Sequence, residues 1–142
     1  MKKSTRQIKY LVVHCSATPE GRNHTAKDID AWHRQRGFDG IGYNYVIRLD
    51  GTVEEGRDVN KIPSHVKGYN KESIGICYIG GIDKNTLQPK DTRTAAQKEA
   101  LKKLLTELKK LYPQAEILGH RDFPNVAKAC PCFNAKIEYK NL

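Results

Sequence analysis

Short apolar runs rich in β-branched residues recur along the chain and predict buried strands. The run "IKYLVVH" predicts a strand that ends at His14, and "SIGICYIGG" predicts a second core strand, which two glycines close. A last short strand is predicted over "AEILGH", ending near His120. Between the first two runs, "YNYVIRLDGTVEEGR" predicts a hairpin, because Asp50 and Gly51 stand between two extended segments.

Two other stretches carry apolar positions at helical spacing. "TAKDIDAWHRQRG" predicts a helix that Thr25 caps. Its inner face is expected to carry Ile29, Trp32 and the aliphatic stem of Arg36. "TAAQKEALKKLLTELKKLY" predicts a longer helix, opened by a capping box over 94–97. The apolar stripe of this second helix consists of Leu101, Leu104, Leu105, Leu108 and Leu111. Strands interleaved with helices predict an α/β fold with a mostly mixed central sheet flanked by helices.

Length and composition favour a single globular domain. The chain has 142 residues, of which 38% are hydrophobic and 29% are charged. The apolar run near the N-terminus is shorter than the ~7–15-residue hydrophobic region of a signal peptide. No stretch approaches the ~20 apolar residues of a membrane span. We therefore expect synthesis in the cytoplasm without a signal peptide, and no membrane partner.

A net charge of +9 indicates a surface that attracts polyanions, whether nucleic acid, anionic lipid or a carboxylate-rich cell wall. Part of the excess lies on the solvated face of the longer predicted helix. No basic stripe is interleaved with aromatic residues and no nucleic-acid-binding module occurs, so we expect no nucleic-acid partner. The sequence also favours a monomer.

His14, His120 and Cys130 form a candidate metal-binding set. Zinc takes imidazole nitrogen and thiolate sulfur, and a catalytic zinc uses three protein ligands. Two strands far apart in the sequence each end on or near a histidine, and sites in open α/β sheets commonly gather at strand ends. The spacing alone is a weak signal, because the two histidines are 106 positions apart (120 − 14). A strand-end histidine or a buried thiol is also an ordinary packing residue.

The other cysteines have plainer interpretations, with one open case. Cys15 adjoins His14, and successive strand residues point to opposite faces, so Cys15 is expected in the core together with Cys77. Cys132 lies two residues past Cys130, and it stays open as a replacement or additional ligand. Without a signal peptide, reduced thiols or metal ligands are expected rather than disulfides. Among the remaining histidines, packing or surface positions are expected for His24 and His33. His65 lies in a loop, and a place lining a cleft stays open for it as the less favoured alternative.

Five motifs occur in an order that matches a known family: "YLVVHCSAT", "GYNYVIRLDGTVEEGR", "SIGICYIGG", "GHRDF" and "KACPCF". The chain resembles the zinc-dependent N-acetylmuramoyl-L-alanine amidases, especially the bacteriophage amidase-type lysozymes. Animal peptidoglycan recognition proteins belong to the same superfamily. The resemblance covers residues 8–135 and marks them as the core of one amidase domain over 1–142.

The resemblance implies a role for each matching residue. The zinc ligands would be His14, His120 and Cys130, and the catalytic residues Tyr43 and Lys128. The zinc would lie at strand ends in a surface cleft. The implied reaction is hydrolysis of the amide between the lactyl group of N-acetylmuramic acid and L-alanine, in peptidoglycan or a muropeptide. The implied biology is that of an endolysin, which acts on the wall after release from the cytoplasm.

Some assignments have competing interpretations. From the residues alone, Tyr43 is equally a packing partner of Tyr45, because strand alternation places both on one face with Asn44 opposite. Asp122 is expected to make local loop hydrogen bonds, and no residue is an obvious general base. Many relatives carry an aspartate where this chain has Cys130. The alternative function is a non-catalytic module that binds peptidoglycan, but catalytically silent relatives typically lack this cysteine.

Overall fold

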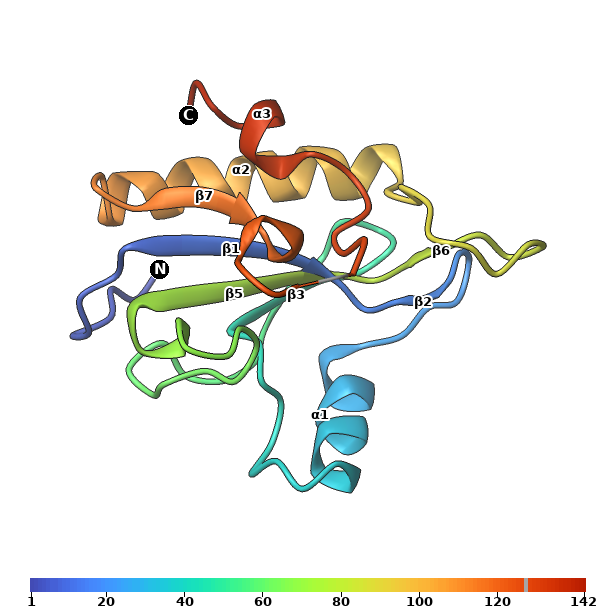
Figure 1. Ribbon diagram of the computed structural model, residues 1–142, viewed down its shortest axis with the longest axis horizontal. Helices are drawn as coiled ribbons and strands as arrows, with labels where there is room; N and C mark the ends of the chain where they lie inside the picture. The colour runs from blue at the N-terminus through green and yellow to red at the C-terminus, as the bar shows by residue number, and fades with distance from the viewer. Residues whose placement is uncertain (127) are drawn as a thin grey trace.

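A five-stranded sheet forms the centre of the computed structural model, which describes residues 1–126 and 128–142 (Figure 1). The strand order is β4-β3-β5-β1-β7, and a separate small sheet pairs β2 with β6. The strands are β1 (Tyr10–Cys15), β2 (Thr18–Pro19), β3 (Tyr45–Ile47), β4 (Val53–Glu55), β5 (Ser73–Tyr78), β6 (Gly81–Ile82) and β7 (Glu116–Gly119). The helical segments are α1 (Ala26–Gln35), α2 (Ala95–Leu111), α3 (Ala135–Glu138) and the 3₁₀ turns η1 (Asn70–Glu72) and η2 (His120–Asp122).

The sheet is mixed, as the sequence predicts. β1 pairs in parallel with both β5 and β7, and β3 pairs in parallel with β5, whereas β4 is antiparallel to β3. The predicted hairpin is therefore β3–β4, and Gly51 in its turn has a φ of +87°. Because the carboxyl ends of parallel strands meet at one edge, residues that follow β1 and β7 are brought together there.

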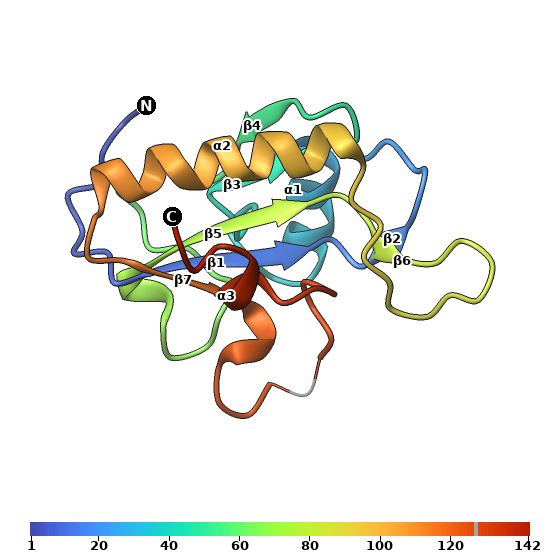
Figure 2. The same cartoon turned by 90° about the horizontal axis from the view of Figure 1, so that it is seen from above.

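Helices cover both faces of the sheet (Figures 1 and 2). α2 lies along one face, with α3 close to β7, and α1 lies on the opposite side. Leu11, Val13 and Cys15 of β1 belong to the core beneath α2, whereas Val12 belongs to a cluster on the other face. By the same alternation His14 points away from α2. The fully or nearly buried leucines of α2 are Leu101, Leu104, Leu105 and Leu108.

Both predicted helix starts are confirmed. Thr25 caps α1 and Thr94 caps α2, each in a reciprocal capping box completed by Asp28 and Gln97. Such caps satisfy backbone N–H groups that the helix itself leaves unpaired and are worth roughly 0.5–2 kcal/mol each. Within residues 1–126 and 128–142, no helix is both long and apolar enough to cross a membrane.

The predicted inner face of α1 is wrong at one position. Arg36 is exposed, and its guanidinium carbon lies 5.2 Å from the centre of the Phe38 ring. The buried residues of the helix are Ile29 and His33, one turn apart. The helix ends at Gln35, one residue before the arginine, so helical spacing no longer determines where Arg36 points.

Tyr43 and Tyr45 do not share a face, contrary to the prediction from strand alternation. β3 begins only at Tyr45, which packs in the core beneath α2, while Tyr43 packs with the cluster on the α1 side. Asn44 interrupts the alternation, because its side chain accepts a hydrogen bond from the Gly75 amide (3.0 Å) and donates one to the Arg57 carbonyl (3.0 Å). The backbone of Asn44 still pairs with Gly75 and Gly56, but the regular strand begins only at Tyr45.

Candidate metal centre

His14 lies near the carboxyl end of β1, in the interior of the sheet, and is only 1% exposed. Its strand neighbours are β5 on one side, where Cys77 is opposite His14, and β7 on the other. β7 ends at Gly119, so His120 emerges directly beside the end of β1 and opens the turn η2. The ring centres of His14 and His120 are 4.5 Å apart.

One side-chain nitrogen from each of these histidines and the Cys130 sulfur lie within 4.8 Å of one another. The His14 Nδ1 atom is 3.8 Å from the Cys130 Sγ atom. The backbone N–H of Cys15 donates to the same sulfur at 3.2 Å, an interaction that stabilises a thiolate. Two imidazole nitrogens and one thiolate are a donor set that suits zinc. The three residues predicted as ligands are therefore brought together.

The loop that carries Cys130 is fixed to the sheet by hydrogen bonds around it. The Arg121 amide donates to the Cys130 carbonyl at 2.9 Å, and the Tyr78 hydroxyl donates to the Pro131 carbonyl at 2.6 Å. Phe133, which follows, is buried in the core. These contacts hold the sulfur at the strand ends although residues 128–134 form neither helix nor strand.

Cys132 lies beside the core rather than among the imidazoles. Its sulfur is 3.9 Å from the Cys15 sulfur and 3.4 Å from the Gly81 carbonyl oxygen. Cys15 and Cys77 are buried, as predicted, and all four cysteines of the chain are free thiols. The geometry therefore favours Cys130 over Cys132 as the sulfur ligand.

Burial keeps the imidazoles in the neutral form that binds metal. Loss of solvent lowers the pKa of His14 well below its ordinary value, and the neighbouring His65 and His120 lower it further. Burial also lowers the pKa of His65 to about 3. The pKa of His120 is lowered by burial and by the positive charge of Lys128. Neutral imidazoles offer lone pairs, so the site is ready for a cation at neutral pH.

A cleft of about 410 Å³ opens above these histidines. Tyr43 lies on its wall, with its ring centre 4.9 Å from that of His14. Burial, with some contribution from the nearby Cys77, raises the pKa of Tyr43 well above its ordinary value, so the phenol keeps its proton. The exposed Lys128 lies at the rim. The residues that line the cleft include His14, His33, His65, His120, Tyr43, Lys128, Arg36, Phe38 and Lys67.

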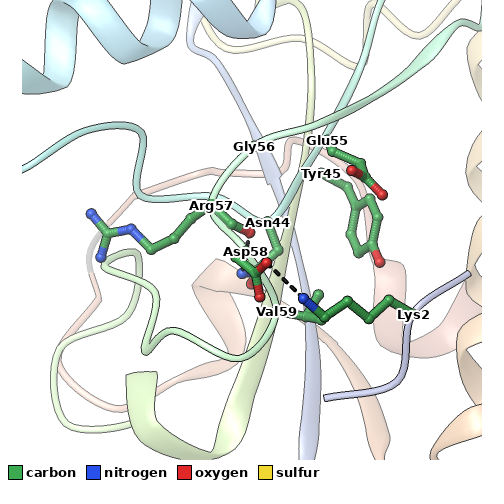
Figure 3. Close-up of a pocket in the computed structure, with 8 residues that line it drawn as sticks. All are labelled: Lys2, Asn44, Tyr45, Glu55, Gly56, Arg57, Asp58 and Val59. Atoms are coloured by element: carbon green, nitrogen blue, oxygen red, sulfur yellow. Dashed lines mark hydrogen bonds and ion pairs between the residues drawn. The ribbon is translucent and has the colours of Figure 1, made fainter. Parts of the chain in front are cut away.

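A second, smaller hollow of about 120 Å³ lies where the N-terminal segment meets the β3–β4 region (Figure 3). The Lys2 side chain lies along its edge, and the Lys2 ammonium pairs with the Asp58 carboxylate at 2.8 Å. The eight residues labelled there include no histidine or cysteine, so this hollow offers no set of metal ligands comparable to that of the cleft.

Comparison with known proteins identifies the family. The sequence matches the family model described as N-acetylmuramoyl-L-alanine amidase over residues 4–133. The chain belongs to this amidase family. It is 44% identical to the endolysin of Klebsiella phage KP32 over 131 residues, which cover 92% of this chain and 85% of that protein.

Solved structures of related proteins support the assignment of this chain to the amidase family. N-acetylmuramoyl-L-alanine amidase LysC from Clostridium intestinale superposes with a TM-score of 0.77 at 29% identity, covering 97% of this chain and 89% of LysC. A mutant of Drosophila PGRP-LB, solved in complex with tracheal cytotoxin, superposes with a TM-score of 0.75 at 27% identity, covering 99% and 84%. The protein is thus a peptidoglycan amidase with the fold that the recognition proteins share.

Some cleft residues of the amidase were missed or only partly predicted. His33 was expected to pack and does, accepting a hydrogen bond from the Gly42 amide at 2.9 Å, but it also lines the cleft. Arg36 and Phe38 reach the rim from the end of α1. A helical count from Ile29 finds His33 on the same face, so that signal was available. His65 also lines the cleft, which is the less favoured alternative from the sequence. Asp122 makes the expected local bond, accepting from the Gly119 amide at 2.8 Å.

The buried histidines predict a pH dependence for the metal-free amidase. An unfolded histidine titrates near pH ~6.5. His14 and His65 have lowered pKa values in the folded chain. As the pH falls, they therefore take up protons in the unfolded chain before they do so in the folded chain. Their contribution to stability is complete above pH ~6.5 and is lost as the pH falls, by about 1.4 kcal/mol per pH unit for each histidine.

Urea unfolding of chelator-treated protein between pH 7.5 and pH 5 measures this slope. In a His65→Asn variant, the dependence of the unfolding free energy on pH should be smaller by the contribution of one histidine. A flat profile in the wild type would contradict the prediction.

Proposed function

We propose that this amidase depends on zinc and hydrolyses the amide between the lactyl group of N-acetylmuramic acid and L-alanine. His14, His120 and Cys130 are the proposed ligands. The observation that supports the proposal most strongly is the convergence of their three donor atoms within 4.8 Å, with both histidines lining the cleft. A bound zinc ion would polarise the scissile carbonyl and lower the pKa of a water molecule towards ~7.

The protein groups around the ligands suit this chemistry. Two neutral imidazoles and one thiolate leave the site with a net positive charge when a divalent ion is present, so the ion stays a Lewis acid. The backbone amide of Cys15 donates a hydrogen bond to the Cys130 sulfur, which would stabilise the negative charge of a thiolate ligand. The carboxyl ends of paired strands provide a rigid base for His14 and His120.

Lys128 is proposed to stabilise the oxyanion that develops when the amide carbon becomes tetrahedral. It lies only two residues before Cys130 and lines the same cleft as His14 and His120. Its positive charge lowers the pKa of both histidines. A cation held near the developing negative charge favours the transition state over the ground state.

Tyr43 is proposed to donate a hydrogen bond to the reacting groups. Its ring lies beside His14, and its raised pKa keeps the hydroxyl protonated throughout the neutral range. A protonated phenol can support either the carbonyl oxygen of the substrate or the attacking water. No carboxylate lines the cleft among the described residues, so the general base is not assigned to an aspartate or glutamate.

The outer cleft is suited to an anionic peptide. Arg36, Lys67 and Lys128 place three cationic side chains around it, and the Phe38 ring adds an apolar surface. The Drosophila recognition protein described above was solved with tracheal cytotoxin. We take from this likeness that a muropeptide, or the corresponding part of intact peptidoglycan, occupies the cleft here. By likeness to phage endolysins, we further propose that the enzyme acts on the wall after release from the cytoplasm. The monomer that the sequence favours stays a proposal.

The test is to digest purified sacculi and analyse the products by mass spectrometry. The expected products are free stem peptides that begin with L-alanine and intact glycan strands, with release stopped by a chelator and restored by zinc. Peptides released by cleavage between amino acids, or muropeptides released by glycan cleavage, would refute the proposed bond. Binding of sacculi without any release would instead support the recognition module that the sequence leaves as the alternative.

A further inference from the structure

His65 makes a chain of hydrogen bonds that the proposed reaction does not use. Its Nδ1 atom lies 2.7 Å from the Nε2 atom of His14, and its Nε2 atom lies 2.9 Å from the hydroxyl oxygen of Ser73. The Ser73 hydroxyl is in turn 3.4 Å from the Asn70 carbonyl oxygen. The rings of His14 and His65 are nearly perpendicular, at 80°. The chain therefore runs from a proposed ligand, through a second imidazole, to the backbone.

Occupation of His14 by a cation would set the direction of every bond in this chain. The Nδ1 atom of His14 faces the Cys130 sulfur, so it is the nitrogen that would bind metal and must be free of a proton. Its Nε2 atom then carries the proton and donates to His65. A neutral His65 that accepts at Nδ1 carries its own proton on Nε2 and donates to Ser73. The hydroxyl of Ser73 can donate a hydrogen bond to the Asn70 carbonyl.

The surrounding backbone holds His65 in place. The side-chain oxygen of Asn70 accepts hydrogen bonds from the amides of His65 (2.9 Å) and Val66 (2.8 Å), which fixes the loop. Under the ring lies Gly75 of β5, and a Cβ at this position would come within 2.9 Å of the imidazole carbons. The absent side chain at position 75 thus leaves the space that the ring occupies.

We propose that His65 is a positioning residue for the metal site: it accepts the Nε2 proton of His14, and so selects the tautomer and ring orientation that present Nδ1 to the cation. This inference rests on the proposed zinc site. Partners that accept a hydrogen bond from a ligating histidine typically contribute about 10–100-fold to metal affinity. His65 should contribute this amount without touching the metal.

The test compares zinc affinity, measured by competition with a chelating dye, in wild type and three variants. Asparagine places an oxygen where Nδ1 of the imidazole stood, whereas glutamine reaches only the place of Nε2. H65N should therefore bind zinc within a few-fold of wild type, and H65Q should bind it about 10–100-fold more weakly. Gly75→Ala keeps His65 but displaces its ring, and should weaken zinc binding in the same direction.

Thermal unfolding of the metal-free proteins separates positioning from damage to the fold. If H65N and H65Q unfold at similar temperatures but differ in zinc affinity, the accepting atom is responsible. ¹⁵N NMR of the zinc-loaded wild type should find the proton of His65 on Nε2. A proton on Nδ1, or equal affinities of H65Q and wild type, would overturn the inference. If the wild type itself binds no zinc, the proposed function fails instead.

Discussion

Replacing Cys130 by alanine should abolish zinc retention and wall lysis together. The substitution removes the one thiolate of the three-donor cluster and leaves two imidazoles that cannot complete a site with three protein ligands. The loss of affinity should exceed the ~10–100-fold that follows from losing a supporting hydrogen bond. Elemental analysis of purified protein and dye release from labelled peptidoglycan measure the two effects.

Cys132 provides the matched control for this experiment. It is a half-buried thiol two residues further along the same loop, and its sulfur faces Cys15 and the Gly81 carbonyl. A Cys132→Ala variant should keep both zinc and lysis. If Cys130→Ala retains full lysis after metal removal, the metal mechanism is refuted. If Cys132→Ala loses zinc while Cys130→Ala keeps it, the sulfur ligand has been assigned to the wrong cysteine.

Replacing Lys128 by alanine should lower kcat by about 10²–10³-fold while zinc stays bound, because the proposed donor to the developing oxyanion would be lost. Lys128 is exposed at the rim and makes no part of the donor cluster, so the fold and the metal should be unaffected. Steady-state kinetics on a soluble muropeptide, together with zinc content, distinguish this outcome from a loss of the site.

Lys67 is a suitable comparison, since it is also exposed and lines the same cleft. Lys67→Ala removes the same unit of charge but no proposed contact with the reacting carbonyl, so it should raise KM more than it lowers kcat. Equal losses of kcat in the two variants would assign both lysines to general electrostatic attraction. Loss of zinc from Lys128→Ala would show that this lysine supports the metal site rather than the transition state.

Elements with long, regular patterns could be predicted from the sequence. α2 was recognisable from its capping box and leucine stripe, because seventeen residues of helical spacing leave little ambiguity. The β3–β4 hairpin followed from its Asp50-Gly51 turn, and the strand through His14 from its β-branched run. The opposite orientations of His14 and Cys15 followed from strand alternation alone.

The site was predictable only in part. Spacing could not bring His14 and His120 together, and the motifs resembling the amidases supplied that link. Local irregularity defeated the alternation rule at Tyr43, where the side chain of Asn44 bonds to Gly75 and Arg57 in addition to the backbone pairing. The contact between His14 and His65 joins a strand to a loop 51 positions away, and no local pattern encodes it.

The side chains at the base of the cleft and those at its rim come from different kinds of backbone. His14 and His120 lie in or directly after paired strands, whereas Phe38 and Lys67 lie in loops. Loops tolerate substitution far better than strands in the middle of a sheet. A library of variants confined to these rim positions would therefore sample new stem-peptide preferences without disturbing hydrolysis, and could redirect this small enzyme against other bacteria.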